Sequence, residues 1–167
     1  MSKITTLLLC YTLIILSGCA GIEVSIDKEI EPYLVRAREA AEQFEIGSKG
    51  LVSYSFVDSF TDSTGANKAY VGVCKTYEDG SRHVYLKKGW WDLQTDLGRV
   101  SLVTHEMLHC EYRMAHTEYG IMGPNIGQTI HAIANLGLEE ALFEAFQDKI
   151  LLGEKDDKHS KDCNHVH

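Results

Sequence analysis

Apolar residues recur along the first third of the chain in the pattern of a helix followed by a strand. Between positions 27 and 46 they lie three or four residues apart, which places them on one face of a helix. These residues are Ile30, Leu34, Ala37, Ala41 and Phe44. Residues 51–60 instead alternate largely between apolar side chains and serines, as a half-buried strand does. The sequence therefore predicts a helix over 27–46 and a strand over 51–60.

A β-hairpin is predicted after this strand and a loop. Residues 70–77 and 82–88 are strand-like and flank Glu78-Asp79-Gly80-Ser81. Asp-Gly suits the tight turn of a hairpin because both residues readily adopt positive φ. Together with the strand over 51–60, the hairpin would make a small mixed sheet.

Three helical patterns follow the hairpin. Apolar residues over 96–113 recur at steps of three and four, and His105 and His109 fall nearly opposite them, so this helix is placed to line a cleft. The apolar stripe consists of Val100, Val103, Met107 and Cys110. A shorter helical segment near 127–135 and a helix over 138–152 complete the set. These elements predict an α+β fold.

The first 18 residues have the organisation of a secretion signal. Lys3 precedes an apolar run over 4–16, which is too short for an ordinary transmembrane helix and has the length of a signal-peptide core. The run ends in Leu16-Ser17-Gly18-Cys19, which resembles the lipobox of bacterial lipoproteins. The resemblance implies that residues 1–18 are removed as a signal peptide and that Cys19 is lipidated. An uncleaved anchor with an incidental Cys19 is the alternative.

Both interpretations place the folded domain outside the cytoplasm and tether it to a membrane. Residues 19–26 are the expected lipidated tether, and Ala20 after the cysteine implies, by resemblance, sorting to the outer membrane of a bacterial cell envelope. One domain is expected over 27–152, a length that can bury a core. Residues 153–167 are charged, lack apolar periodicity and are predicted to form a disordered tail.

Acidic side chains outnumber basic ones, 24 to 16, which gives a formal net charge of −8 at pH 7. This balance argues against binding to nucleic acid and against charge-driven binding to anionic bilayers. The expected membrane association therefore depends on the lipid at Cys19.

The chain has five cysteines, of which Cys10 would leave with the signal peptide and Cys19 would carry lipid. Cys74, Cys110 and Cys163 remain, in a compartment that permits disulfides. The pairings to consider are Cys74–Cys110 and Cys110–Cys163. Buried, unpaired cysteines are the alternative, and the odd number leaves at least one thiol free or bonded to another chain.

His105-Glu106-Met107-Leu108-His109 is an HExxH sequence on the helix predicted over 96–113. Histidines four residues apart project from one face about one turn apart, so both imidazoles can bind one tetrahedral zinc ion. Glu106 would lie beside them without binding the metal, in place to act as a general base toward water. The alternative for the two histidines is an ordinary structural role.

A zinc ion used in catalysis takes three protein ligands and keeps a position open for water. His116 is the nearest candidate, but a continuous helix would carry it roughly 10 Å beyond His109. The helix must therefore end near 112–114 and the chain must turn back, although neither glycine nor proline occurs before Gly120. The rival third ligands are glutamates of the last helix, Glu139, Glu140 and Glu144.

The stretch resembles the metzincin clan of zinc metallopeptidases, whose pattern is HExxHxxGxxH followed by a methionine-containing turn. Three residues match the start of that pattern, namely His105, Glu106 and His109. His116 stands one residue later than the third histidine of the pattern, whose place Ala115 takes, and Tyr112 takes the place of the glycine. Gly120-Ile121-Met122-Gly123-Pro124 looks like the Met-turn, with Met122 beneath the metal, although Met122 can equally be a core residue.

This resemblance implies a zincin/metzincin-like catalytic domain with an N-terminal helix, an active-site helix, the Met-turn and a C-terminal helix. It implies a zinc-dependent endopeptidase in which water attacks a peptide bond, Glu106 acts as base and then acid, and no covalent intermediate forms. A strand from 70–88 would bind an extended peptide substrate by β-addition.

A different class of function stays open, namely a zinc-binding lipoprotein with a structural or partner-binding role and weak or no peptidase activity. A structural zinc site would use four protein ligands, and Cys74 is a candidate fourth. The tail is a second segment rich in metal-ligand residues, and it can equally be solvated without a metal. These residues are His159, Cys163, His165 and His167.

Overall fold

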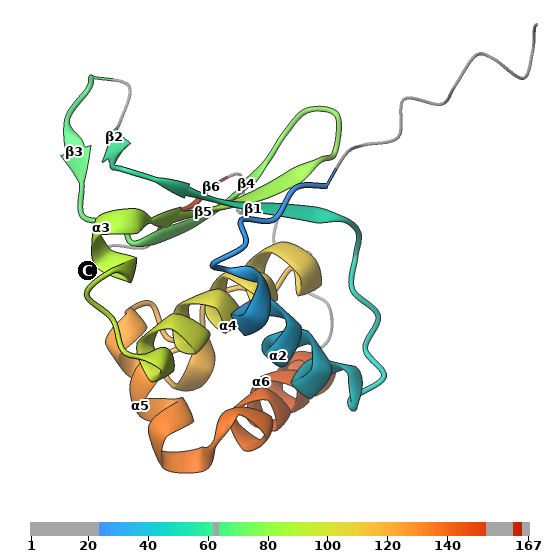
Figure 1. The fold of residues 1–167 in the computed structure, drawn as a ribbon. Helices are drawn as coiled ribbons and strands as arrows, with labels where there is room; N and C mark the ends of the chain where they lie inside the picture. The colour runs from blue at the N-terminus through green and yellow to red at the C-terminus, as the bar shows by residue number, and fades with distance from the viewer. Residues whose placement is uncertain (1–23, 62–63, 153–161, 165–167) are drawn as a thin grey trace, which may run out of the picture.

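The computed structural model describes residues 24–61, 64–152 and 162–164. Within them a small mixed sheet lies on one side of a group of helices, which confirms the predicted α+β class (Figure 1). In chain order the elements are α2 (Glu31–Glu42), β1 (Val52–Val57), β2 (Phe60–Thr61), β3 (Asn67–Lys68), β4 (Gly72–Thr76), β5 (Arg82–Lys87), α3 (Lys88–Trp91), α4 (Asp96–Tyr112), η1 (Gly120–Met122), α5 (Ile126–Leu136), α6 (Leu138–Leu152) and β6 (Asp162–Asn164).

The main sheet has the strand order β1-β5-β4-β6. β1 runs parallel to β5, whereas β4 is antiparallel to β5, so the predicted hairpin is confirmed. Its turn is closed by the amide of Tyr77, which donates to the carbonyl oxygen of Ser81 (2.9 Å), and by Gly80 at φ 81°. The positive φ explains why glycine stands at this position.

β6 was not expected from the sequence, which predicted a disordered tail over 153–167. Asp162–Asn164 instead pair antiparallel with β4. The pairing uses backbone groups that the outer edge of a strand leaves available, so it needs no apolar pattern in the sequence. Residues 153–161 and 165–167 lie outside the described residues, and with them His159, His165 and His167.

Only the end of the predicted tether 19–26 is described. The amide of Tyr54 donates to the carbonyl oxygen of Ser25 (2.9 Å), and the amide of Asp27 donates to that of Tyr54 (3.0 Å). These two hydrogen bonds join residues 25–27 to β1. The predicted signal peptide and Cys19 lie outside the described residues, in which no helix is both long and apolar enough to span a membrane.

α2 is shorter than the helix predicted over 27–46. It begins after Ile30 with a proline in its first turn, where a missing backbone N–H costs nothing. Glu45, at φ 54°, stands in the left-handed region just beyond its end. The apolar face identified from the sequence does face the core, because Leu34, Ala37 and Ala41 are buried.

α4 is the central helix of the domain. The side chain of Thr95 caps its start by accepting a hydrogen bond from the amide of Gly98 (3.3 Å). The sequence predicted one apolar face and one face toward a cleft, but every residue over 100–112 is buried. This difference arises because α2, α5, β4 and β5 pack around α4 from several directions.

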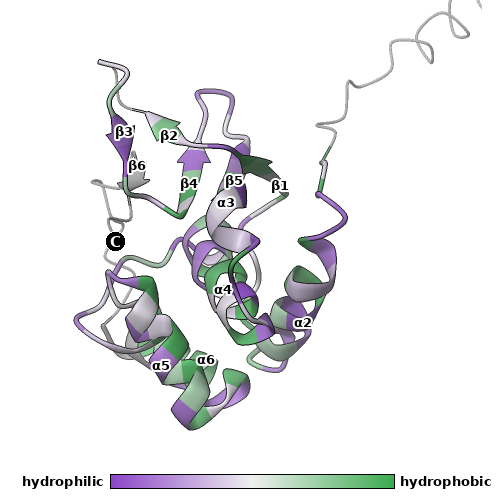
Figure 2. Cartoon of the chain, turned by 60° about the vertical axis from the view of Figure 1, so that its left-hand side comes forward, coloured by the Kyte–Doolittle hydropathy of each residue, from purple (hydrophilic) through white to green (hydrophobic). Residues whose placement is uncertain are grey.

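The core fills the space between the sheet and the helices. Figure 2 shows hydrophobic residues along parts of β1, α4, α5 and α6. The large side chains that are fully buried come from both layers and include Leu34, Tyr54, Leu86, Met107, Leu108, Leu142 and Phe146. Burial of this apolar surface holds α4 in place, since the hydrophobic effect is the main favourable term in folding.

Polar contacts fix the C-terminal half of α4 as well. The buried carboxylate of Glu111 accepts hydrogen bonds from the hydroxyl of Tyr54 in β1 (2.7 Å) and from the guanidinium of Arg38 in α2 (2.6 Å). Cys110, the preceding residue, forms a disulfide with Cys74 of β4, one of the two pairings considered from the sequence. The end of α4 is therefore connected to β1, α2 and β4.

Candidate metal centre

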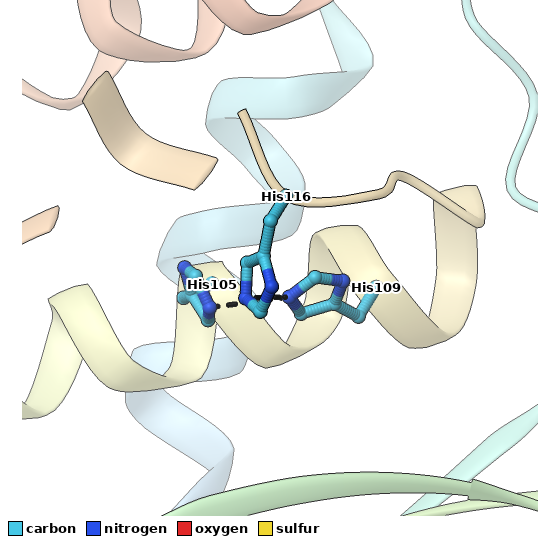
Figure 3. Close-up of side chains that lie close together, drawn as sticks. All are labelled: His105, His109 and His116. Atoms are coloured by element: carbon cyan, nitrogen blue, oxygen red, sulfur yellow. Dashed lines mark hydrogen bonds between the residues drawn. The ribbon is translucent and has the colours of Figure 1, made fainter. Parts of the chain in front are cut away.

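Three histidine rings meet at one point beside α4 (Figure 3). His105 and His109 project from the helix, and His116 comes from the segment that follows it. The Nε2 atom of His109 lies 3.1 Å from Nε2 of His105 and 3.2 Å from Nε2 of His116. Nitrogen ligands about 2.0–2.1 Å from a tetrahedral metal are separated from one another by about 3.3 Å. Both distances from His109 thus match the spacing of ligands around one ion, and one ligand atom of each of the three rings lies within 4.8 Å of the others.

The chain turns back after Tyr112, as the distance between His109 and His116 demanded. Arg113 adopts the left-handed conformation, at φ 53°, and the amide of Met114 donates to the carbonyl oxygen of Leu108 (3.1 Å). A left-handed residue at the end of a helix reverses the chain, and arginine takes this role although glycine is favoured there. The sequence thus predicted where the helix ends, but not which residue makes the turn.

Two backbone carbonyls determine the protonation of the helix histidines. Nδ1 of His105 lies 2.7 Å from the carbonyl oxygen of Ile121, and Nδ1 of His109 lies 2.6 Å from that of Met114. A carbonyl oxygen cannot donate, so each Nδ1 must carry the proton. In the neutral rings both Nε2 atoms then present lone pairs to each other, and a bound cation removes that repulsion. The donor set therefore fits a metal ion.

A threonine supports the same arrangement. Thr129 of α5 is fully buried, and its hydroxyl donates to the carbonyl oxygen of Ile121 (2.9 Å). That hydroxyl oxygen also lies 3.2 Å from Nδ1 of His105. Contacts of this kind orient a histidine ligand before the metal arrives. The two carbonyls carried no signal in the sequence, because every residue has a backbone carbonyl. No sequence pattern placed Thr129 beside His105 either.

The three histidines differ in their exposure to solvent. His105 and His109 are buried, whereas His116 is exposed. The protein around the His116 ring nevertheless lowers its pKa by desolvation, which favours the neutral imidazole that binds metals. His116 is therefore the member of the group that is exposed to solvent, and a site with an open coordination position needs such exposure.

Glu106 lies between α4 and β4 and is completely buried. Burial raises the pKa of its carboxyl group well above the ordinary value, because the protein interior disfavours the charged form. Gly72 of β4 covers it so closely that a Cβ atom there would lie 2.8 Å from the carboxyl carbon of Glu106. A glycine inside a strand often marks such a close approach, which was the one available sequence signal for this contact.

The rival ligands lie elsewhere. The glutamates of α6, Glu139, Glu140 and Glu144, are exposed and do not belong to the three-histidine group. Cys74 is bonded to Cys110, so its thiol is not available as a fourth ligand. Among the described residues, His105, His109 and His116 form the one group of three or more ligand-type side chains close enough to hold an ion.

Met122 lies at the end of η1 and is buried in the core. Its carbonyl oxygen accepts from the amide of Thr117 (2.9 Å), which ties this turn to the segment that carries His116. The neighbouring residue Ile121 supplies the carbonyl that holds His105. The turn predicted as a Met-turn thus lies against the metal centre, and its contacts to the histidines run through its backbone.

None of the protein families, curated proteins or solved structures compared with this chain matches it. The geometry is therefore the basis for any assignment. A group of three histidines, two of them buried with fixed tautomers, can hold one metal ion.

The contact between Gly72 and Glu106 predicts a steric defect in Gly72→Ala. The added methyl group must displace the Glu106 carboxyl group, so the free energy of unfolding should fall by about 1–3 kcal/mol. Gly89→Ala is the matched control, because a Cβ atom at Gly89 meets nothing within 4 Å. Urea denaturation measures both variants, and equal stability of the two would contradict the close approach.

The raised pKa of Glu106 predicts a pH dependence of stability in the metal-free protein. Above the ordinary value of 4.5 the unfolded chain releases this proton while the folded chain keeps it, so the wild type loses stability as the pH rises toward the folded pKa. Glu106→Gln cannot titrate and so removes the effect. As the pH rises, the free energy of unfolding of this variant should increase relative to that of the wild type by up to about 1.4 kcal/mol per pH unit.

Urea denaturation after chelation, from pH 4.5 upward, follows this difference. The exposed Glu144→Gln serves as the control. A pH-independent difference between Glu106→Gln and the wild type, or the same slope in Glu144→Gln, would contradict the burial of an uncharged carboxyl group at Glu106.

Proposed function

We propose that this protein is a zinc-dependent endopeptidase, related in architecture to the metzincins and tethered to the bacterial cell envelope through a lipid at Cys19. The observation that carries the proposal is the convergence of three imidazole Nε2 atoms beside a helix that also bears Glu106. Three histidines with an open side form the donor set of a catalytic zinc ion. A structural zinc site would take a fourth protein ligand, and the described residues offer none.

Zinc bound to such a site supplies Lewis acidity that polarises a peptide carbonyl and acidifies water. The histidines act as neutral ligands, and the carbonyls of Ile121 and Met114 keep His105 and His109 in the required tautomer. A nearby dication lowers the pKa of a carboxyl group. Loading the site therefore favours the ionised form of Glu106, which can take a proton from the attacking water and deliver it to the leaving nitrogen.

The difference from the metzincin pattern has a simple structural explanation. In HExxHxxGxxH the turning glycine precedes the third histidine by three residues. Here the left-handed Arg113 precedes His116 by three residues as well, and α4 contains one more residue before the turn. A one-residue extension of the helix thus moves both the turn and the third histidine, which supports the metzincin resemblance.

The second candidate is a zinc-binding lipoprotein with a structural or partner-binding role. The complete burial of Glu106 favours it, because a general base has to reach water in the open part of the site. The exposure of His116 favours the peptidase. Zinc binding and peptide hydrolysis, measured on matched variants, separate the two.

Removal of His116 should weaken zinc binding while leaving the fold intact. The chain starting after Cys19 is expected to bind one zinc ion tightly, and His116→Ala is expected to bind it at least about a hundredfold more weakly. Equilibrium dialysis against a zinc chelator measures this, with His131→Ala as the control for an exposed histidine. All three proteins carry alanines at His159, His165 and His167 to exclude zinc capture by the tail. Equal affinities would remove His116 from the centre.

Glu106→Gln should separate metal binding from hydrolysis. The variant is expected to bind zinc with unchanged stoichiometry and to cleave peptides about 10²–10⁴ times more slowly, because it cannot accept a proton. Cleavage of a mixed peptide library, followed by mass spectrometry, provides the measurement, with Glu144→Gln as the control. Zinc binding without any cleavage by the parent chain would support the structural or partner-binding alternative instead.

A further inference from the structure

We propose that residues 162–164 of this chain act as a built-in competitor, because they occupy the outer edge of β4, at which the proposed peptidase would bind an extended substrate, and peptide substrates must displace them. The proposal rests on the peptidase function proposed above. It adds a competitor for the substrate, built into the same chain, and it names the backbone of β4 as the surface for which substrate and β6 compete.

The first support is the register of β6. Asp162–Asn164 lie antiparallel to β4, with Lys75 opposite Asp162, Cys74 opposite Cys163 and Val73 opposite Asn164. β4 bonds to β5 along its other edge, so within the described part of the chain β6 occupies the edge of β4 that β5 leaves open. This edge therefore accepts an extended chain, and it does so through backbone groups that any peptide without proline can supply.

The second support is the position of β4 beside the metal centre. Gly72, the first residue of β4, covers Glu106, which lies between His105 and His109 in the sequence. Cys74 is bonded to Cys110, the residue directly after His109. An extended chain on the outer edge of β4 therefore pairs with the strand that lies against the catalytic half of α4.

The direction of β6 leads it toward that region. Because the strands are antiparallel and Asn164 pairs with Val73, β6 runs toward the Gly72 end of β4. A peptide bound in the same manner would run in the same direction.

The shortness of β6 makes the competition reversible. β6 pairs through three residues only, and even a longer isolated pair of strands has marginal stability in water. Attachment to the same chain compensates through a high effective concentration. A free peptide that pairs over more residues of β4 can thus displace β6 without any unfolding of the domain.

The register provides a direct test, because it places Cys163 opposite Cys74. In the full-length Cys110→Ser chain, Cys74 loses its disulfide partner, and mild oxidation with diamide should join Cys74 to Cys163 within one molecule. Diamide takes up the two electrons and two protons that the thiols lose. The matched control is Cys74→Ser, which keeps Cys110 and Cys163 and should crosslink at least tenfold more slowly. Mass spectrometry of proteolytic peptides identifies the bond.

Excess extended peptide should slow the crosslinking of Cys74 with Cys163, and a scrambled peptide containing prolines should not. Equal crosslinking in the two cysteine variants, or none in a Cys110→Ser chain whose circular dichroism is native, would overturn the docking edge.

A second measurement covers the case in which that variant does not fold. In the zinc-loaded full-length chain, Cys163→Pro should raise amide hydrogen exchange in β4 at least tenfold, and Ser160→Pro should not.

Hydrolysis distinguishes this proposal from the proposed function. Cys163→Pro should lower the KM for an extended peptide several-fold and leave kcat unchanged, because it removes a competitor and touches no group at the metal. An unchanged KM together with unchanged exchange in β4 would overturn the competition while the peptidase stands. Crosslinking in register without hydrolysis by any variant would overturn the peptidase while β6 remains docked.

Discussion

Two hydrogen bonds from histidine rings to backbone carbonyls determine what the centre of this protein can do. The carbonyls of Ile121 and Met114 require protons on Nδ1 of His105 and His109, and this turns the Nε2 lone pairs toward one another. The two Nε2 atoms lie 3.1 Å apart, and with both rings neutral this contact is unfavourable unless a proton or a metal ion lies between them. Arg113, which ends α4, brings Met114 and His116 to this point, so the turn supplies both an acceptor and the third ligand.

The surrounding fold holds this arrangement from several sides. β4 lies against Glu106 through Gly72 and is bonded to α4 through Cys74 and Cys110, so strand and helix form one unit. The carboxylate of Glu111, bonded to Tyr54 and Arg38, fixes the last turn of the helix. β1, β5 and β4 form the other three strands of the sheet, and β6 pairs with the outer edge of β4.

The elements were predictable from the sequence where a pattern reports on burial or on a turn. The hairpin around Gly80 and the helix from Asp96 carried such signals, whereas the cysteines left two pairings open, of which the structure shows Cys74–Cys110. The convergence of the three histidines was predictable because HExxH places two of them on one helix face and helix geometry then demands a turn before His116. Backbone contacts were not predictable, which is why Thr129, the Ile121 carbonyl and the pairing of β6 had to come from the structure. The burial of α4 on all sides was missed because two of its neighbours, α2 and β4, come from distant parts of the chain.

X-ray absorption at the zinc edge tests the central claim most directly, because it counts the atoms bound to the metal. For the zinc-loaded chain with alanines at His159, His165 and His167, we predict three imidazole rings and one further oxygen at about 2.0–2.1 Å, with no sulfur. In His116→Ala one imidazole should be lost from the spectrum. A sulfur scatterer, a fourth imidazole, or an unchanged spectrum in that variant would contradict the three-histidine centre.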